Sequence, residues 1–94
     1  MRFLGKVAII TGAGQGIGAA YAQALAQEGA SIVIAEIDRI NGQQAAEKIC
    51  QSGYAAIFIE TDIASETSCA AMAKKAVDTF GGIDFLINNA SVFS

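Results

Sequence analysis

The 94-residue sequence contains no histidine, no proline and no tryptophan, and it has only two cysteines. Without histidine, these residues cannot supply a Ser-His-Asp triad, a Cys-His pair or an HExxH zinc site. Cys50 and Cys69 have no CxxC spacing, and both fall in segments with a helical pattern. We therefore expect two reduced, partly buried thiols, and we predict neither a cysteine nucleophile nor a metal site.

Basic residues are also few. Six Lys and Arg face nine Asp and Glu, which gives a net charge of -3. This balance is the opposite of a nucleic-acid-binding footprint, so nucleic acid and anionic membrane surfaces are not expected partners. Apolar runs such as 7–10 and 32–35 are far shorter than the ~20 residues that cross a bilayer, and no signal-peptide core precedes Thr11. We expect a soluble, cytoplasmic protein.

What the sequence does contain is an alternation of short apolar runs with alanine-rich stretches of helical periodicity. This alternation is typical of βαβ units and a parallel sheet. The predicted strands are 6–11, 31–36, 55–60 and 84–88, and the predicted helices are 16–28, 39–51 and 66–80. Because each strand is a nearly continuous apolar run, we expect it to be buried on both faces.

The helices carry end signals and candidate inner faces. Asp38 and Ser65 are predicted N-caps, and Gly29 is a predicted left-handed C-cap. In the first helix, Ile17, Tyr21 and Leu25 recur at fourfold spacing, and alanines at most other positions allow close approach to the sheet. The predicted inner faces of the second and third helices are Ala45, Ala46, Ile49 and Cys50, and Cys69, Met72, Ala73, Ala76, Val77 and Phe80.

A glycine-rich loop, 11–18, joins the first strand to the first helix. A strict GxGxxG reading from Gly12 fails because residue 17 is isoleucine, whereas TGxxxGxG fits without adjustment. Glycines here would let a pyrophosphate approach the backbone N–H groups at the positive end of the helix. The alternative is an ordinary turn followed by a tightly packed helix, but the position between a buried strand and a helix favours phosphate binding.

Glu36 ends the second strand, 18 residues after Gly18. An acidic side chain about 20 residues after such a loop reaches the adenosine ribose, accepts from the 2′-OH of NAD and repels the 2′-phosphate of NADP. The alternative is a solvated strand-end glutamate. Asp38 and Arg39 follow directly, so a cation near the ribose is possible and NADP is not excluded. Gln15 in the loop is neutral and cannot pair with a 2′-phosphate. On balance the sequence favours NAD over NADP.

Polar residues also follow the third and fourth strands. Asp62 could accept from an adenine amino group at the carboxyl edge of the sheet, or it could be a turn aspartate before the Ser65 cap. Asn88 and Asn89 end the fourth strand, where amides need partners for their donors and acceptors. They could stabilise the sheet, contact a cofactor, or do both.

Taken together, these motifs resemble the N-terminal half of a short-chain dehydrogenase/reductase, and the resemblance spans essentially the whole chain. It implies a Rossmann-type doubly wound α/β fold with strand order 3-2-1-4. It also implies that the loop binds pyrophosphate, that Glu36 binds the adenosine ribose, that Asp62 and Ile63 bind adenine, that Asn89 and Ala90 lie near the nicotinamide-side ribose, and that Asn88 ties the central strands. The implied cofactor-binding set is Gly12, Gly14, Gln15, Gly16, Ile17, Gly18, Glu36, Asp62, Ile63, Asn89 and Ala90.

Two departures from the family pattern stand out. Ser91 replaces a glycine that is common in the family, which leaves the cofactor assignment intact. The family's YxxxK motif is expected beyond the position where this chain stops, and Tyr21 and Tyr54 cannot substitute for its tyrosine, because the residues four positions later are Leu25 and Phe58. No catalytic residue can be assigned, and we expect the 94-residue chain to be inactive alone.

We therefore interpret residues 1–94 as a partial NAD(P)-binding domain whose fourth strand would be an exposed apolar edge. The resemblance implies that the complete protein is a homo-oligomer that transfers a hydride between the nicotinamide and a small alcohol or ketone. The alternatives are a non-catalytic nucleotide-binding or interaction module and an inactive remnant. The substrate cannot be identified from these residues, since the family builds its substrate pocket from the C-terminal half.

Overall fold

The structure is a computed structural model that describes residues 2–14 and 16–89. All seven predicted elements are present, and each boundary lies within one residue of its prediction. Their order is β1 (Val7–Thr11), α1 (Gly16–Gln27), β2 (Ser31–Glu36), α2 (Arg39–Gln51), β3 (Ala56–Glu60), α3 (Glu66–Phe80) and β4 (Phe85–Asn88).

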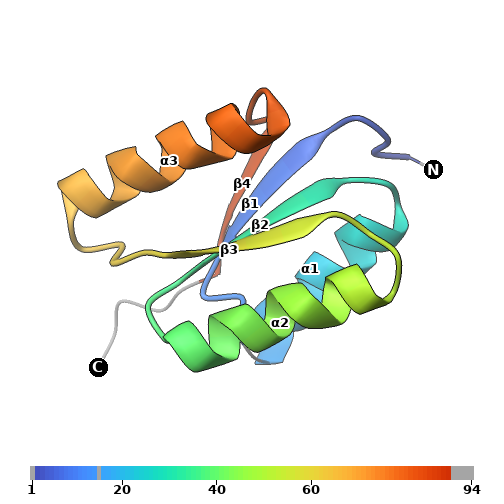
Figure 1. The fold of residues 1–94 in the computed structure, drawn as a ribbon, viewed down its shortest axis with the longest axis horizontal. Helices are drawn as coiled ribbons and strands as arrows, with labels where there is room; N and C mark the ends of the chain where they lie inside the picture. Colours follow the sequence, from blue (N-terminus) through green and yellow to red (C-terminus); the bar gives the residue numbers. More distant parts are fainter. Residues whose placement is uncertain (1, 15, 90–94) are drawn as a thin grey trace.

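The four strands form one parallel sheet in the order β3-β2-β1-β4, which confirms the doubly wound topology. Helices α1 and α2 cover one face of this sheet and α3 covers the other (Figure 1). Thr11 lies opposite both Ala35 and Asn88, and Glu36 lies opposite Glu60. The carboxyl ends of all four strands therefore meet at one edge, where doubly wound folds bind ligands.

The predicted helix ends are confirmed. The Asp38 side chain accepts from the N–H of Asn41 at 3.0 Å and caps α2. The Ser65 hydroxyl accepts from the N–H of Ser68 at 3.1 Å and caps α3. Gly29 has a φ of 96°, in the left-handed region expected for a residue that follows a helix.

The core lies on both faces of the two central strands. Alternate residues of β1 and β2 point to opposite faces, so Ile10 and Ile34 pack against α1 and α2 while Ile9 and Val33 pack on the α3 side. The fully buried positions of α1 are Gly18, Ala22 and Ala26.

The fourfold stripe of larger side chains is therefore not the buried face of α1. Ile17 is 69% exposed and Tyr21 is 51% exposed, while Leu25 is only partly buried. The physical reason is close packing, because a helix that carries glycine and alanine on one side can approach the sheet more closely than one that carries isoleucine and tyrosine.

Two residues of the predicted inner faces are exposed, so the prediction is wrong for them. Cys50 is exposed, because Gly42, Ala46 and Ile49 occupy the buried side of α2. Its thiol donates to the carbonyl of Ala56 at 3.3 Å. Val77 is 44% exposed on the flank of α3. Cys69 is partly buried as expected, and both cysteines are free.

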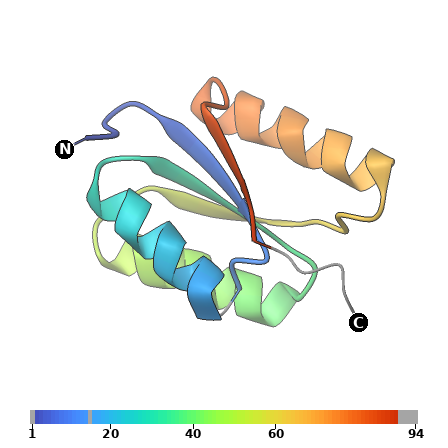
Figure 2. The same ribbon diagram turned by 180° about the vertical axis from the view of Figure 1, so that it is seen from behind.

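Burial on both faces holds for β1 and β2 but not for the outer strands. β3 is half-buried, and β4 is mostly exposed, with Leu86 at 64%. Figure 2 shows β4 on the outside of the sheet beside β1, as the predicted exposed edge requires. Among the described residues, no helix is both long and apolar enough to span a membrane.

Candidate functional site

A hollow of about 160 Å³ lies at the carboxyl edge of β1, β2 and β3. Backbone hydrogen bonds join the ends of these strands, since the N–H of Gly12 donates to Ala35 at 3.0 Å and the N–H of Thr61 donates to Glu36 at 2.9 Å. The hollow is lined by Gly12, Ala35, Glu36, Ile37, Thr61, Asp62 and Ile63. The structure therefore brings four of the predicted site residues, from three separate segments, into one concavity.

The glycine loop joins the carboxyl end of β1 to the start of α1. Gly12 has a φ of 64° and Gly16 a φ of 65°, a region that favours glycine over residues with a side chain. Because α1 begins at Gly16, the unpaired N–H groups of its first turn lie at the carboxyl edge of the sheet. This is the arrangement that favours a bound anion.

Glu36 is attached to the loop by its carboxylate. One oxygen accepts from the N–H of Gly14 and the other from the N–H of Asp38, each at 3.0 Å. A Cβ added to Gly14 would lie only 2.9 Å from the first of these oxygens. Glu36 is half-buried and fixed by two hydrogen bonds, so it is not a freely solvated strand-end side chain.

Asp62 has the local geometry of a turn residue. It is exposed, one of its carboxylate oxygens accepts from the N–H of Ala64 at 3.0 Å, and its own N–H donates to the hydroxyl of Ser68 at 2.9 Å. This matches the structural alternative considered from the sequence, although Asp62 and Ile63 also line the hollow. An adenine contact by these two residues stays a prediction.

Asn88 and Asn89 tie the end of β4 to β1 and to the glycine loop. The Thr11 hydroxyl donates to Oδ1 of Asn88 at 2.9 Å and accepts from the N–H of Asn89 at 3.1 Å. The Asn89 side-chain amide donates to the carbonyl of Gly12 at 3.4 Å. Asn88 thus joins two strands, as the resemblance implied, while Asn89 supports the loop.

Sequence reasoning gave no role to Thr11 or Thr61. Thr11 is 5% exposed and connects both asparagines, and Thr61 is 2% exposed and lines the hollow. The sequence did offer one indication of their importance: Thr11 is the last residue of an apolar strand, and Thr61 directly follows another. The pairing itself depends on which strands are neighbours in the sheet, and spacing along the chain does not reveal that.

We predict that Thr11→Val destabilises the intact protein by about 1–3 kcal/mol, because it removes the hydroxyl that donates to Asn88 and to the Ile87 carbonyl and leaves the Asn89 N–H without that acceptor. Thr11→Ser keeps the hydroxyl and should reduce the stability much less. Urea denaturation of both variants measures the difference. Equal midpoints for Val and Ser would show that the hydroxyl does not carry this connection.

The other predicted residues are less informative. Ile17 lies in the first turn of α1 and is exposed there. Gln15 and Ala90 lie outside the described residues. Within residues 2–14 and 16–89, His, Cys, Asp and Glu form no group of three or more that could hold a metal ion. The hollow combines the carboxylate residues Glu36 and Asp62 and the hydroxyl residue Thr61 with the apolar residues Ala35, Ile37 and Ile63.

The family model for short chain dehydrogenases matches residues 6–94. The chain belongs to the short chain dehydrogenase family. Similar relatives include an uncharacterised oxidoreductase of Thermotoga maritima, 49% identical over 96% of this chain and 35% of the relative. A galactitol 2-dehydrogenase of Agrobacterium fabrum is 44% identical over 99% of this chain and 35% of the relative.

Solved structures of this family superpose closely on the chain. A hydroxysteroid dehydrogenase from Escherichia coli has a TM-score of 0.93 and 41% identity, with 96% of this chain and 38% of that chain covered. A short chain dehydrogenase from Mycobacterium avium has a TM-score of 0.93 and 35% identity, with coverage of 100% and 37%. The chain spans about a third of the length of the relatives it matches, so it corresponds to an N-terminal segment of a short chain dehydrogenase.

Proposed function

We propose that the complete protein is an NAD-dependent oxidoreductase that acts on a small alcohol or ketone, and that this chain supplies the dinucleotide-binding portion. The observation that carries the proposal is the junction of Glu36 with the glycine loop beside the hollow. A bound nicotinamide supplies the hydride chemistry of such enzymes. Cytoplasmic localisation and a homo-oligomeric state remain predictions from the sequence and the resemblance.

The residues of the site fit such a cofactor. The first turn of α1 and the loop before it would hold the pyrophosphate, since glycines at 12, 16 and 18 keep side chains away from the backbone donors. Glu36 would accept from the adenosine ribose, and the hollow beside it would take the adenine between Asp62 and Ile63. Asn89, bonded to the Gly12 carbonyl, would support the loop near the nicotinamide half.

Charge at this edge favours NAD over NADP. Glu36, Asp38, Glu60 and Asp62 place four carboxylates at or just after the ends of β2 and β3, against the single cation Arg39. A 2′-phosphate would bring further negative charge among these carboxylates, whereas a 2′-OH could donate a hydrogen bond to one of them. The expected preference is therefore for NADH.

The test is the cofactor selectivity of Glu36→Gln, which removes the charge and keeps one acceptor oxygen. We expect the ratio of NADPH to NADH dissociation constants to fall by about tenfold, as for the loss of a hydrogen bond to a charged group. Fluorescence titration of the intact protein measures both constants. A ratio that does not change would remove Glu36 from the ribose site.

One observation favours a second candidate, a nucleotide-binding module without catalytic activity. This observation is the exposed β4 edge, with Leu86 64% exposed, onto which a second chain could pair. The two candidates differ in turnover, since both bind NADH but only the oxidoreductase consumes it with an alcohol or ketone. A homogeneous protein with an intact mass of 9.6 kDa that binds NADH without turnover would favour the module.

A further inference from the structure

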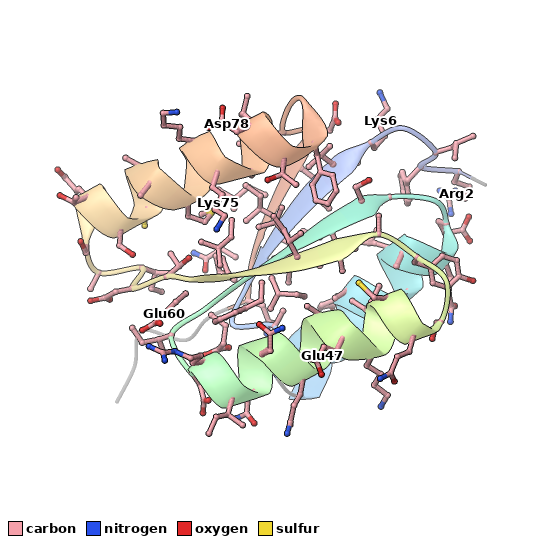
Figure 3. All side chains as sticks on the ribbon, viewed as in Figure 1. Arg2, Lys6, Glu47, Glu60, Lys75 and Asp78 are labelled. Atoms are coloured by element: carbon pink, nitrogen blue, oxygen red, sulfur yellow. The ribbon has the colours of Figure 1, made fainter. Side chains whose placement is uncertain are left out.

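An ion pair lies beside the candidate ribose site. Arg39 is the first residue of α2 and Glu60 the last residue of β3, and the Arg39 Nε donates to Oε1 of Glu60 at 3.2 Å. Glu60 is also the strand partner of Glu36 in the parallel register. Figure 3 shows the Glu60 side chain at the end of β3, beside the start of α2. The pair thus connects the start of α2 to the end of β3, directly before Thr61 and Asp62 of the hollow.

Arg39 is the residue that matters most for a 2′-phosphate. It is the only Lys or Arg between Lys6 and Lys48, and it follows Glu36 by three residues. A nearby arginine is the usual means by which a Rossmann-type site accommodates NADP. The other charged residues of this stretch are all acidic. The preference between NAD and NADP therefore depends on where the Arg39 guanidinium is held.

Glu36 is not the residue that holds it. Both Glu36 oxygens accept backbone hydrogen bonds, from Gly14 and from Asp38. The Asp38 carboxylate accepts from the backbone and side-chain nitrogens of Asn41, each at 3.0 Å. Glu60 is the carboxylate that engages the guanidinium, and it does so toward the β3 edge of the sheet.

We propose that Glu60 is a specificity-determining residue, which holds Arg39 in an ion pair and so keeps the guanidinium from a 2′-phosphate. The inference rests on the proposed dinucleotide site. It makes Glu60, in addition to Glu36, a residue that determines the preference for NAD over NADP. Glu36 favours the 2′-OH directly, while Glu60 acts through Arg39. Because the pair is exposed, with 77% and 51% of the two side chains accessible, its contribution is small and depends on salt.

The experiment compares Glu60→Gln with the wild type in the intact protein, by calorimetric titration of NADH, NADPH and 2′,5′-ADP at low salt. We expect the dissociation constants of NADPH and 2′,5′-ADP to fall about two- to fivefold in Glu60→Gln, and that of NADH to change less. This increase in affinity for NADPH and 2′,5′-ADP should be smaller at 0.5 M salt, because screening weakens the contact between the guanidinium and the phosphate.

Two control variants separate release of Arg39 from a simple loss of negative charge. Glu47→Gln makes the same charge change on the exposed face of α2 (Figure 3) and should leave all three constants unchanged. Glu60→Gln combined with Arg39→Gln should lose the NADPH gain. An unchanged NADPH constant in Glu60→Gln, or a gain that persists in the double variant, overturns the proposal.

Failure of the proposed function gives a different result. If the wild-type protein binds neither NADH nor NADPH, the dinucleotide site itself is wrong and this inference fails with it. If NADH binds and depends on Glu36 while Glu60→Gln has no effect on NADPH, only the role of Glu60 is overturned.

Discussion

Replacing Gly18 by alanine is expected to destabilise the protein and to weaken NADH binding. A Cβ at this position would lie 2.5 Å from the carbonyl oxygen of Gly12, 2.6 Å from Nδ2 of Asn89 and 2.9 Å from Cα of Ala13. Two of these three atoms belong to the backbone, so they cannot move aside without a shift of the glycine loop. The substitution therefore separates α1 from the loop that it supports.

The expected effect is opposite in sign to the usual one. Gly18 lies in a helix and has no positive φ, so alanine would ordinarily stabilise it by about 1 kcal/mol. Overpacking of a close contact costs about 1–3 kcal/mol, and here it acts on backbone atoms. With the gain of about 1 kcal/mol subtracted, we expect a net loss of up to about 2 kcal/mol in urea denaturation. We also expect a rise of at least about tenfold in the NADH dissociation constant.

Gly82→Ala is the matched control. Gly82 also lacks a positive φ, and a Cβ there would meet no heavy atom within 4 Å. It should leave both stability and NADH binding close to the wild type. If Gly18→Ala proves as stable as this control, the contact of α1 with the glycine loop is not the close approach that the geometry indicates.

Most of the fold could be predicted because its signals are local. The caps at Asp38 and Ser65 and the helix-ending glycines lie within one turn of the features that they determine. Alternation of strands with helices predicts parallel pairing, because a helical crossover returns the chain to the same end of the sheet. The meeting of the glycine loop with Glu36 was predictable for the same reason, since both lie at the carboxyl ends of adjacent strands.

The features that the sequence did not predict depend on distances across the sheet. The alanines of α1 lie against the sheet as expected, but the fourfold spacing of Ile17 and Tyr21 did not reveal that these two side chains are exposed. The Thr11 hydroxyl forms hydrogen bonds with Asn88 and Asn89 because β1 and β4 are neighbours in the sheet. The pairing of Arg39 with Glu60 likewise joins residues from two elements.

Gly42→Ala is the second substitution with a large expected effect. Gly42 is buried in the interior of α2, where alanine is ordinarily the better residue by about 1 kcal/mol. A Cβ there would overlap Cε1 and Cδ1 of the Phe58 ring and would lie 3.1 Å from Cβ of Glu36. We expect the overlap to cost about 1–3 kcal/mol, because Phe58 packs against the core on that face and cannot move without losing contacts. With the ordinary gain subtracted, Gly42→Ala should give a net loss of up to about 2 kcal/mol.

A double-mutant cycle with Phe58→Leu tests whether this contact is the cause. Leucine lacks the ring atoms that the new Cβ would overlap, so the added cost of Gly42→Ala should largely disappear in the Phe58→Leu background. Urea denaturation measures the four stabilities, and NADH titration reports whether the shift reaches Glu36. Stabilisation by Gly42→Ala in the wild-type background, as for an ordinary helix glycine, would contradict the prediction. A cost that persists with Phe58→Leu would assign the effect to Glu36 instead, and the selectivity for NADH over NADPH should then fall with it.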